Sequence, residues 1–365
     1  MENNAPYFDE SVELLKDLIR TPSFSREEYG TATLIENFLV KYDANPRRLK
    51  NNVYAFSDNF DLSRPAILLN SHHDTVKPNA DWTKNPFLPE IADGNLYGLG
   101  SNDAGGALVS LLSAFLHLRK ADLPFNLIYA ATAEEENAGS GGIELLLPEL
   151  GLIDCAVVGE PTSMQTAVAE RGLMVLDCTV YGRSGHAARN VGINAIERAL
   201  PALQWFASYQ FPKISPLLGS VKMTVTQISA GTQHNVIPAR CSFVTDIRLN
   251  DCYTHQELFD IIAASCGCEI SARSMRLKPS SISNEHPLAV ASRRLGIPTF
   301  ASPTMSDQAL LTMPSIKIGP GDSARSHTAD EFISLQEISE GISCYISLLQ
   351  ELAAIYETLG QRRHD

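Results

Sequence analysis

The chain lacks an apolar run of the length that a membrane-spanning helix needs. Of its 365 residues, 44% are hydrophobic and 19% are charged, yet no apolar stretch approaches the roughly 18 residues that cross a bilayer. Residues 1–6 are polar and do not show the basic and then apolar pattern of a secretory signal. We therefore expect a protein of the cytoplasm with no membrane partner.

Clustered positive charge is also scarce. The chain has 29 Lys and Arg against 42 Asp and Glu, which gives a formal net charge of −13. Because nucleic-acid phosphates are bound by clustered Lys and Arg, we expect no nucleic-acid partner. The pattern Gly-x-Gly-x-x-Gly after a strand is missing too, which argues against a dinucleotide-dependent dehydrogenase.

The seven cysteines show no disulfide or zinc pattern. Their number is odd, and only one residue separates Cys266 from Cys268, whereas redox and zinc pairs have two. We expect buried or free thiols and no structural disulfide. Internal repeats and low-complexity tracts are absent from the sequence, and its length favours two domains over one.

Strands and helices are expected to alternate over the first 170 residues. The apolar spacing predicts helices at 8–19, 31–42 and 105–119 and strands at 66–70, 127–132 and 156–158. Such alternation is typical of an α/β fold with a doubly wound, mostly parallel sheet, whose sites form beyond the carboxyl ends of the strands.

The pattern changes at about residue 171. The expected order is a strand at 172–180, a helix at 193–206, strands at 220–229 and 241–248, a helix at 254–264 and a strand at 269–277. This order is typical of a ferredoxin-like α+β domain. The α/β pattern then returns, with helices at 287–295 and 335–356 and a strand at 315–318. We predict a discontinuous domain of residues 1–170 and 281–365, with an inserted domain of residues 171–280.

Five side chains that can bind metal ions stand at the ends of separate expected strands or in turns. They are two histidines and three carboxylates, namely His72, Asp103, Glu136, Glu160 and His327. Mixed imidazole and carboxylate ligands suit divalent ions such as zinc, and an odd carboxylate can bridge two of them. The sequence therefore predicts a paired hydrolytic metal centre.

The neighbours of these residues bear on their roles. His72 and Asp74 face the same side of an extended backbone, so Asp74 can orient the imidazole, whereas His73 faces away. Asp103 lies among glycines, which allow close approach, although an Asp before a helix also commonly caps it.

The three glutamates Glu134, Glu135 and Glu136 directly follow an apolar strand. Adjacent like charges repel, and a cation would relieve that repulsion; a solvated acidic turn is the alternative. If Glu136 binds a metal, Glu135 faces another way and can act as a general base on water.

Taken together, these segments resemble the two-metal amidohydrolase family that includes acetylornithine deacetylase, succinyl-diaminopimelate desuccinylase, aminoacylase and the glutamate-releasing carboxypeptidases. The resemblance covers the chain from about residue 7 to the final helix, and it implies two zinc ions per subunit, with cobalt or manganese as possible substitutes. It implies one ion held by His72, Asp103 and Glu160, and another held by Asp103, Glu136 and His327. Glu135 would be the catalytic base, and Asp74 would support His72.

The resemblance makes the first domain catalytic and the inserted domain a lid and dimerisation domain of a homodimer. The segment Gly182–His186 resembles a loop whose histidine reaches across the dimer and polarises the scissile carbonyl. His186 would then be an oxyanion donor, and Asn235 and Arg248 would bind a substrate carboxylate. For Arg248, an ion pair with Asp246 on one strand face is the alternative.

Three segments depart from the pattern of the family. Gly98-Leu99-Gly100 replaces Gly-Arg-Gly, Ala104-Gly105 replaces Met-Lys, and Glu134-Glu135-Glu136 replaces Asp-Glu-Glu. All five expected ligands are retained. The longer side chain of Glu134 can shift the turn that aims Glu135.

The resemblance as a whole implies a zinc-dependent hydrolase that removes an acetyl or succinyl group from the α-nitrogen of an amino acid. It is greatest for the acetylornithine deacetylase branch, which suggests N-acylornithine or N-acylcitrulline as the small-molecule substrate, as in arginine biosynthesis. An N-acetyl-lysine or succinyl-diaminopimelate deacylase and a metallo-exopeptidase share every ligand and stay open as alternatives. A non-catalytic binding or dimerisation module would bind metal without hydrolysis.

Overall fold

The computed structural model describes residues 5–189 and 191–361, and only the backbone of residues 360 and 361. The chain divides into two compact units. Unit 1 comprises Met1–Val168, Ser281–Phe300 and Ser306–Asp365, and unit 2 comprises Ala169–Ser280 and Ala301–Met305. This division differs from the boundaries expected from the sequence at residues 169–170 and 301–305.

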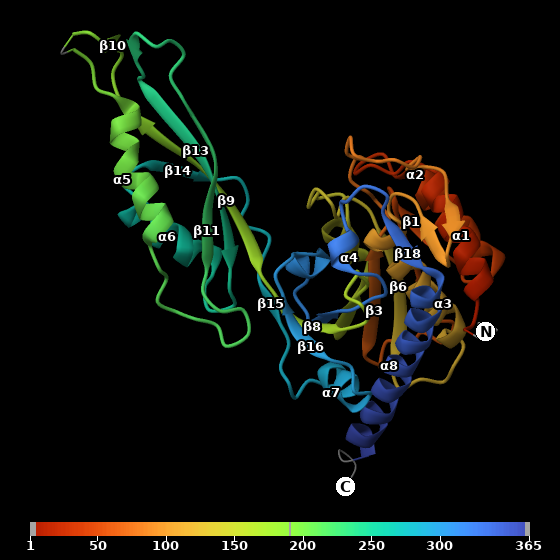
Figure 1. The fold of residues 1–365 in the computed structure, drawn as a ribbon. Helices are drawn as coiled ribbons and strands as arrows, with labels where there is room; N and C mark the ends of the chain where they lie inside the picture. Colours follow the sequence, from red (N-terminus) through yellow and green to blue (C-terminus); the bar gives the residue numbers. More distant parts are fainter. Residues whose placement is uncertain (1–4, 190, 362–365) are drawn as a thin grey trace. The chain divides into compact units, whose positions relative to one another are not determined.

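The main sheet of unit 1 has nine strands in the order β1-β2-β6-β3-β7-β17-β8-β15, with β16 paired to β8 (Figure 1). The strands are β1 (Arg47–Leu49), β2 (Asn52–Phe56), β3 (Ala66–His72), β6 (Asn126–Thr132), β7 (Cys155–Val158), β8 (Thr166–Glu170), β15 (Ser280–Ser281), β16 (Thr299–Ser302) and β17 (Ser315–Lys317).

The parallel part of this sheet is its centre. Strands β6, β3, β7 and β17 pair in parallel, whereas β1 with β2, β2 with β6, and β17 with β8 pair antiparallel. The predicted α/β class is confirmed, and the parallel order is limited to four strands. Because parallel strands end at one edge, the segments that follow β3, β6 and β7 come together there.

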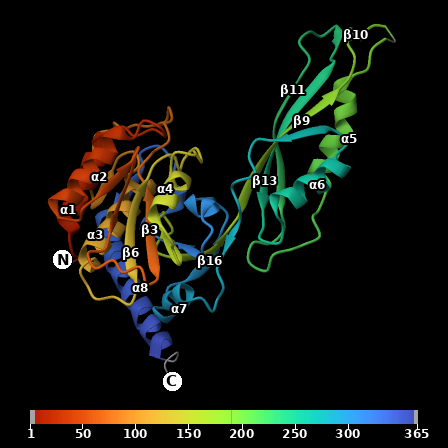
Figure 2. The ribbon, with the colours of Figure 1, turned by 180° about the vertical axis from the view of Figure 1, so that it is seen from behind.

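Helices cover both faces of the main sheet. Figures 1 and 2 show α1 and α3 on one side of β3 and β6, and α4 on the other. Ile67 and Leu69 of β3 belong to the core formed with α1, α3 and α8, whereas Leu68 belongs to the core formed with α4. This alternation confirms a doubly wound sheet. The helices are α1 (Phe8–Arg20), α2 (Tyr29–Lys41), α3 (Gly106–Leu118), α4 (Ile143–Leu150), α7 (Pro287–Arg294) and α8 (Leu335–Gln361).

A small antiparallel sheet of unit 1 joins two distant segments of the chain. Its strand order is β18-β5-β4, with β18 at Phe332–Ser334, β5 at Asn95–Tyr97 and β4 at Glu90–Ala92. Pairing of β18 with β5 brings the residues before position 332 beside those after position 97. The turn that leads into α3 is thereby placed next to the loop that precedes β18.

Unit 2 has an antiparallel sheet in the order β11-β13-β9-β14 with two helices. Its elements are β9 (Gly172–Tyr181), α5 (Ala195–Ser208), β11 (Lys222–Ala230), β13 (Arg240–Leu249), α6 (His255–Ser265) and β14 (Glu269–Ala272). This order is that of a ferredoxin-like domain. Helix α5 begins after Asn194 because that side chain accepts the N–H of Ile196, and α6 begins with a capping box formed by Thr254 and Glu257.

The helices and the cysteines can be compared with what the composition led us to expect. Within the described residues, no helix combines the length and the apolar character that crossing a membrane requires. All seven cysteines lie in the described ranges and are free thiols. The thiol of Cys268 donates a hydrogen bond to Sγ of Cys266 at 3.5 Å, and the two residues form no disulfide.

Candidate metal centre

The five candidate ligands meet at the carboxyl-terminal edge of the central strands of unit 1. The atoms that could bind an ion lie within 4.8 Å of one another in each of two groups. We call them the His72 group, which consists of His72, Asp103 and Glu160, and the His327 group, which consists of Asp103, Glu136 and His327.

The carboxylate of Asp103 belongs to both groups. Its Oδ1 lies 3.3 Å from Nε2 of His72, and its Oδ2 lies 3.5 Å from Nε2 of His327. One oxygen therefore faces each group, which is the arrangement of a bridging carboxylate. Asp103 is not the N-cap of α3, because Gly105 occupies that position and no side chain caps the helix.

The two imidazoles also face the remaining carboxylates. Nε2 of His72 lies 3.7 Å from Oε1 of Glu160, and Nε2 of His327 lies 2.9 Å from Oε2 of Glu136. Nδ1 of His72 lies 3.0 Å from the backbone carbonyl of Asp74 and 3.5 Å from its carboxylate. A proton on Nδ1 would thus be held by Asp74, which leaves Nε2 free to bind an ion.

Asp74 also anchors the acidic turn after β6. Its carboxylate accepts the N–H groups of Glu135 at 3.0 Å and of Glu136 at 3.1 Å, and the hydroxyl of Ser25 at 2.7 Å. His73 contributes to neither group. Its ring hydrogen-bonds with the hydroxyl of Thr31 and a backbone carbonyl, and burial lowers its pKa to about 4.

The longer side chain of Glu134 is accommodated by the loop that follows it. Glu134 has a φ of 57°, and its carboxylate accepts the N–H of Gly141 at 3.3 Å. A β-carbon on Gly139 or on Gly141 would collide with this carboxylate. The two glycines therefore make room for Glu134, while Asp74 fixes the backbone of the next two residues.

Buried negative charge is concentrated around this edge of the sheet. Burial, with the charges of Glu160 and Asp307, raises the pKa of Glu135 well above its ordinary value, although His72 acts in the opposite direction. Burial also raises the pKa of Glu160 to about 8. Such a cluster is unfavourable without cations, and its imidazole and carboxylate donors suit divalent ions such as zinc. The residues present therefore fit a paired metal centre.

Four buried charged residues near the centre were missed from the sequence. They are Glu28, Asp307, Lys317 and Glu331. Asp307 accepts the side-chain amide of Asn70 at 2.7 Å and the hydroxyl of Thr132 at 2.8 Å, which joins β3 to β6. No strand precedes Asp307 directly, so strand-end reasoning could not find it.

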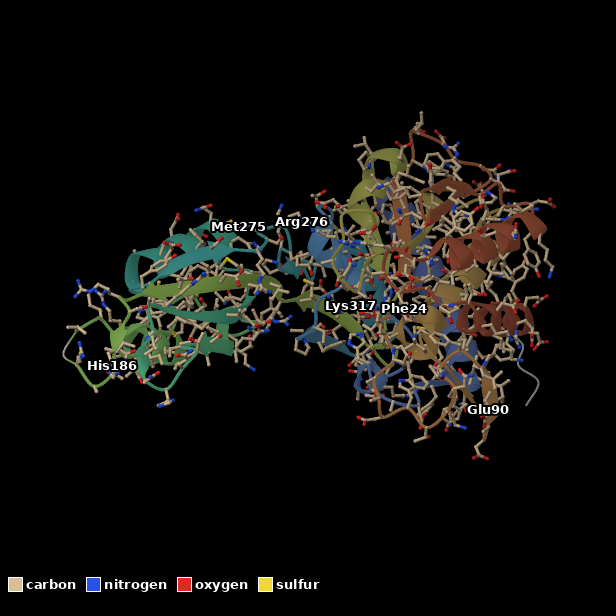
Figure 3. The ribbon with its side chains drawn as sticks, turned by 90° about the horizontal axis from the view of Figure 1, so that it is seen from above. Phe24, Glu90, His186, Met275, Arg276 and Lys317 are labelled. Carbon is tan, nitrogen blue, oxygen red and sulfur yellow. The ribbon has the colours of Figure 1, made fainter. Side chains whose placement is uncertain are left out.

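The other three occupy different positions around the ligands. Glu28 accepts the N–H of Glu134 at 3.2 Å. Lys317, the last residue of β17 (Figure 3), carries a charge that partly opposes the burial that raises the pKa of Glu160. Glu331 follows His327 by four residues, and this spacing was the only signal that could have drawn attention to it.

The remaining predicted site residues lie in unit 2. His186 is exposed in β10 (Gly185–His186), which pairs with β12 (Val236–Ile237). The N–H of Ala187 donates to the carbonyl of Asn235 at 3.0 Å, so His186 and Asn235 are close together. Arg248 forms a bidentate ion pair with Asp246, at 2.8 and 3.1 Å. This ion pair is the alternative to carboxylate binding that the sequence left open for Arg248.

Asn235 and Arg248 lie at opposite ends of unit 2. Arg248 pairs with Leu173 at the start of β9, whereas β10 follows the other end of that strand. Figure 3 shows His186 at one end of unit 2 and Met275 and Arg276 at the other. The structure therefore does not bring Asn235 and Arg248 of one chain to a common site.

The doubly wound sheet, the ferredoxin-like insert and the cluster of carboxylates and imidazoles at the strand ends are the features that the sequence led us to expect of a metal-dependent hydrolase. Residues 68–351 match the sequence pattern of peptidase family M20/M25/M40, and the chain belongs to this family. The expected relationship to amidohydrolases is confirmed, and the protein is an enzyme that acts on amide bonds.

Similar proteins extend over nearly the whole chain. Succinyl-diaminopimelate desuccinylase of Caulobacter sp. strain K31 is 27% identical over 384 residues, which cover 96% of this chain and 98% of the relative. Acetylornithine deacetylase of Proteus mirabilis is 26% identical over 357 residues, with 89% and 92% covered. A dinuclear metal-binding M20 peptidase of Bacillus subtilis has the same fold, with a TM-score of 0.72, 19% identity and coverage of 96% and 99%.

Proposed function

We propose that the protein is a zinc-dependent deacylase that removes an acetyl or succinyl group from the α-nitrogen of an amino acid. The observation that carries this proposal is the carboxylate of Asp103, whose two oxygens face His72 and His327 separately. The desuccinylase and deacetylase names of the relatives support the acyl-amino-acid substrate. N-acetylornithine is the first substrate to test, and N-succinyl-diaminopimelate is its rival.

Glu135 is the proposed base because its backbone is held by Asp74 next to both groups. When bound, the two ions would supply Lewis acidity that polarises the scissile carbonyl and acidifies water. A carboxylate oxygen of Glu135 would accept a proton from the attacking water and deliver it to the leaving nitrogen. Asp74 would keep Nδ1 of His72 protonated, so that Nε2 remains a ligand.

We also propose that the enzyme works as a homodimer through unit 2. About eight residues of β13 separate the two ends of its sheet, which corresponds to roughly 26 Å. One substrate carboxylate therefore cannot contact Asn235 and Arg248 of the same subunit. Strand β11 is an edge strand with mostly exposed side chains, and such an edge can pair with a second copy. His186 and Asn235 of the partner subunit would then complete a site with Arg248.

A hydrolysis panel tests the substrate. Purified protein with added zinc or cobalt would be assayed on N-acetylornithine, N-acetylcitrulline, N-acetyl-lysine, N-succinyl-diaminopimelate and a set of dipeptides. We expect the highest kcat/KM for an N-acyl amino acid. A clear preference for dipeptides would identify an exopeptidase instead, and metal binding without any hydrolysis would identify a binding module.

A complementation experiment tests the shared site. His186→Ala and Arg248→Ala homodimers should both be inactive, whereas a purified heterodimer of the two has one intact site and should recover about half of the wild-type activity. No recovery in a heterodimer of confirmed composition would show that each subunit has a self-contained site.

A further inference from the structure

Glu331 is a buried carboxylate that belongs to neither ligand group, with 2% of its surface exposed. Its Oε1 accepts the N–H groups of Asn102 at 2.8 Å and Asp103 at 2.9 Å, and its Oε2 accepts the N–H of Gly100 at 3.0 Å. Its backbone carbonyl accepts the N–H of Gly98 at 3.0 Å. One residue therefore receives four hydrogen bonds from the turn that carries Asp103.

The backbone of this turn has positive φ angles that residues other than glycine rarely adopt. Gly98 and Gly100 have φ values of 152° and 74°, which favour glycine. A β-carbon on Gly100 would lie 2.6 Å from Cγ2 of Thr75, so the turn is also tightly packed. Its buried N–H groups need acceptors, because unpaired buried N–H groups are destabilising. The carboxylate of Glu331 provides them.

Glu331 also belongs to the segment that carries His327. That segment is interlocked with the Asp103 turn at a second point, where Oδ1 of Asn102 accepts the N–H of Asp322 at 3.0 Å and its amide donates to the carbonyl of Asp322 at 3.1 Å. The pairing of β5 with β18 joins the two segments at their other end. The positions of Asp103 and His327 are thus tied to each other through Glu331.

We propose that Glu331 is a positioning residue that holds Asp103 with one oxygen toward each ligand group, and that it controls the His327 group more strongly than the His72 group. This inference rests on the proposed metal-dependent function. In the His327 group, two of the three ligands lie on the segments that Glu331 joins. In the His72 group, His72 is the last residue of β3 and Glu160 follows β7, and these two strands pair with each other directly.

The test is a titration of metal-free protein with Co²⁺, followed by calorimetry and by visible absorption. Wild-type protein should bind two equivalents. In Glu331→Gln, the NH₂ group takes the place of one carboxylate oxygen. It then faces a buried backbone N–H group, which loses its hydrogen-bond acceptor. We expect the first equivalent to bind within about threefold of wild type and the second to weaken by about 10- to 100-fold, the usual effect of removing a partner that orients a ligand.

Asp330→Asn is the matched control. Asp330 is the neighbouring residue and also accepts backbone N–H groups, but these belong to Thr83 and Lys84, at 3.0 and 2.8 Å. This variant should bind both equivalents as the wild type does. Glu331→Asp keeps the charge with a shorter reach and should show an intermediate loss of the second equivalent, which allows the test even if Glu331→Gln does not fold. Circular dichroism of the metal-free variants checks the fold.

The possible results separate this inference from the proposed function. Two equivalents of wild-type affinity in both Glu331 variants, or equal weakening of both equivalents, would overturn the role of Glu331 and leave the two-metal function in place. Wild-type protein that binds no Co²⁺ would contradict the proposed function and this inference with it.

Discussion

Units 1 and 2 use their polar residues in opposite ways. In unit 1, the candidate ligands are drawn together at one edge of the sheet, where 1% of the His72 side chain and 8% of the Glu136 side chain are exposed, and only His327 among the five is exposed. In unit 2, His186 and Asn235 are exposed, and Arg248 is paired with Asp246 at the far end of the sheet. In the proposed function, unit 1 would therefore supply the groups for chemistry, whereas unit 2 would supply recognition groups that act together with those of a second copy.

The two units also have separate hydrophobic cores. The cores of unit 1 lie on the two faces of the main sheet, and the core of unit 2 lies between its own sheet and the helices α5 and α6. The core of unit 2 shares no residue with the cores of unit 1. The units can therefore be perturbed one at a time, which makes the comparison testable.

The largest expected effect concerns the proposed base. Glu135→Gln keeps the shape of the side chain but cannot accept a proton, so kcat should fall by about 10²- to 10⁴-fold. Zinc content, measured by elemental analysis, should remain that of the wild type. Glu149→Gln, an exposed change on α4, is the control and should leave kcat unchanged. Full activity in Glu135→Gln would show that the chemistry of unit 1 does not depend on this carboxylate.

The next effect, on stability and not on turnover, is expected from core truncations that affect one unit each. Phe115 in unit 1 and Phe243 in unit 2 are 0% and 2% exposed, and replacing either by alanine should cost about 3–5 kcal/mol. By calorimetry with and without zinc, Phe243→Ala should lower a transition that zinc does not shift. Phe115→Ala should lower the transition that zinc raises. A single transition that both variants lower equally would mean that the units unfold together.

The smallest effect concerns the pH dependence of unit 2. Burial lowers the pKa of His255, and its Nε2 lies 3.0 Å from the carbonyl of Leu173. Because the folded pKa is below the unfolded value of about 6.5, the unfolded chain binds the proton first as the pH falls. This group therefore contributes stability above pH 6.5 that is lost towards more acidic pH.

Urea unfolding at pH 7 and pH 5 measures that contribution. The loss of stability between the two values should be smaller in His255→Gln than in the wild type, by up to about 1.4 kcal/mol for each unit by which the pKa is lowered. An identical loss in both proteins would remove His255 as a source of acid sensitivity in unit 2.

The sequence predicted the parts of the fold that have long apolar patterns. Strands β3, β6 and β7 and helix α3 were expected close to their observed bounds, and so the ends that carry His72, Glu136 and Glu160 could be found. Strands β1, β4 and β15 have only two or three residues, too few for a periodic pattern. Strands β1 and β4 pair antiparallel with the next strands along the chain, β2 and β5, so they were missed because they are short and not because their partners are distant.

The residues that hold the ligands could not be predicted in the same way. Glu331 and Asp307 act through hydrogen bonds to backbone or side-chain groups more than 170 residues away in the chain. Neither residue stands in a motif of its own, and an isolated acidic residue is usually on the surface. Their burial follows from the tertiary fold alone.

The unequal exposure of the two imidazoles has a kinetic consequence. His327 has 54% of its side chain exposed, whereas His72 has 1%. An ion held through His327 would meet solvent directly, and one held through His72 would be shielded from competing chelators. Demetallation should therefore proceed in a fast and a slow phase, and the order in which the ions leave would be set by access rather than by ligand chemistry.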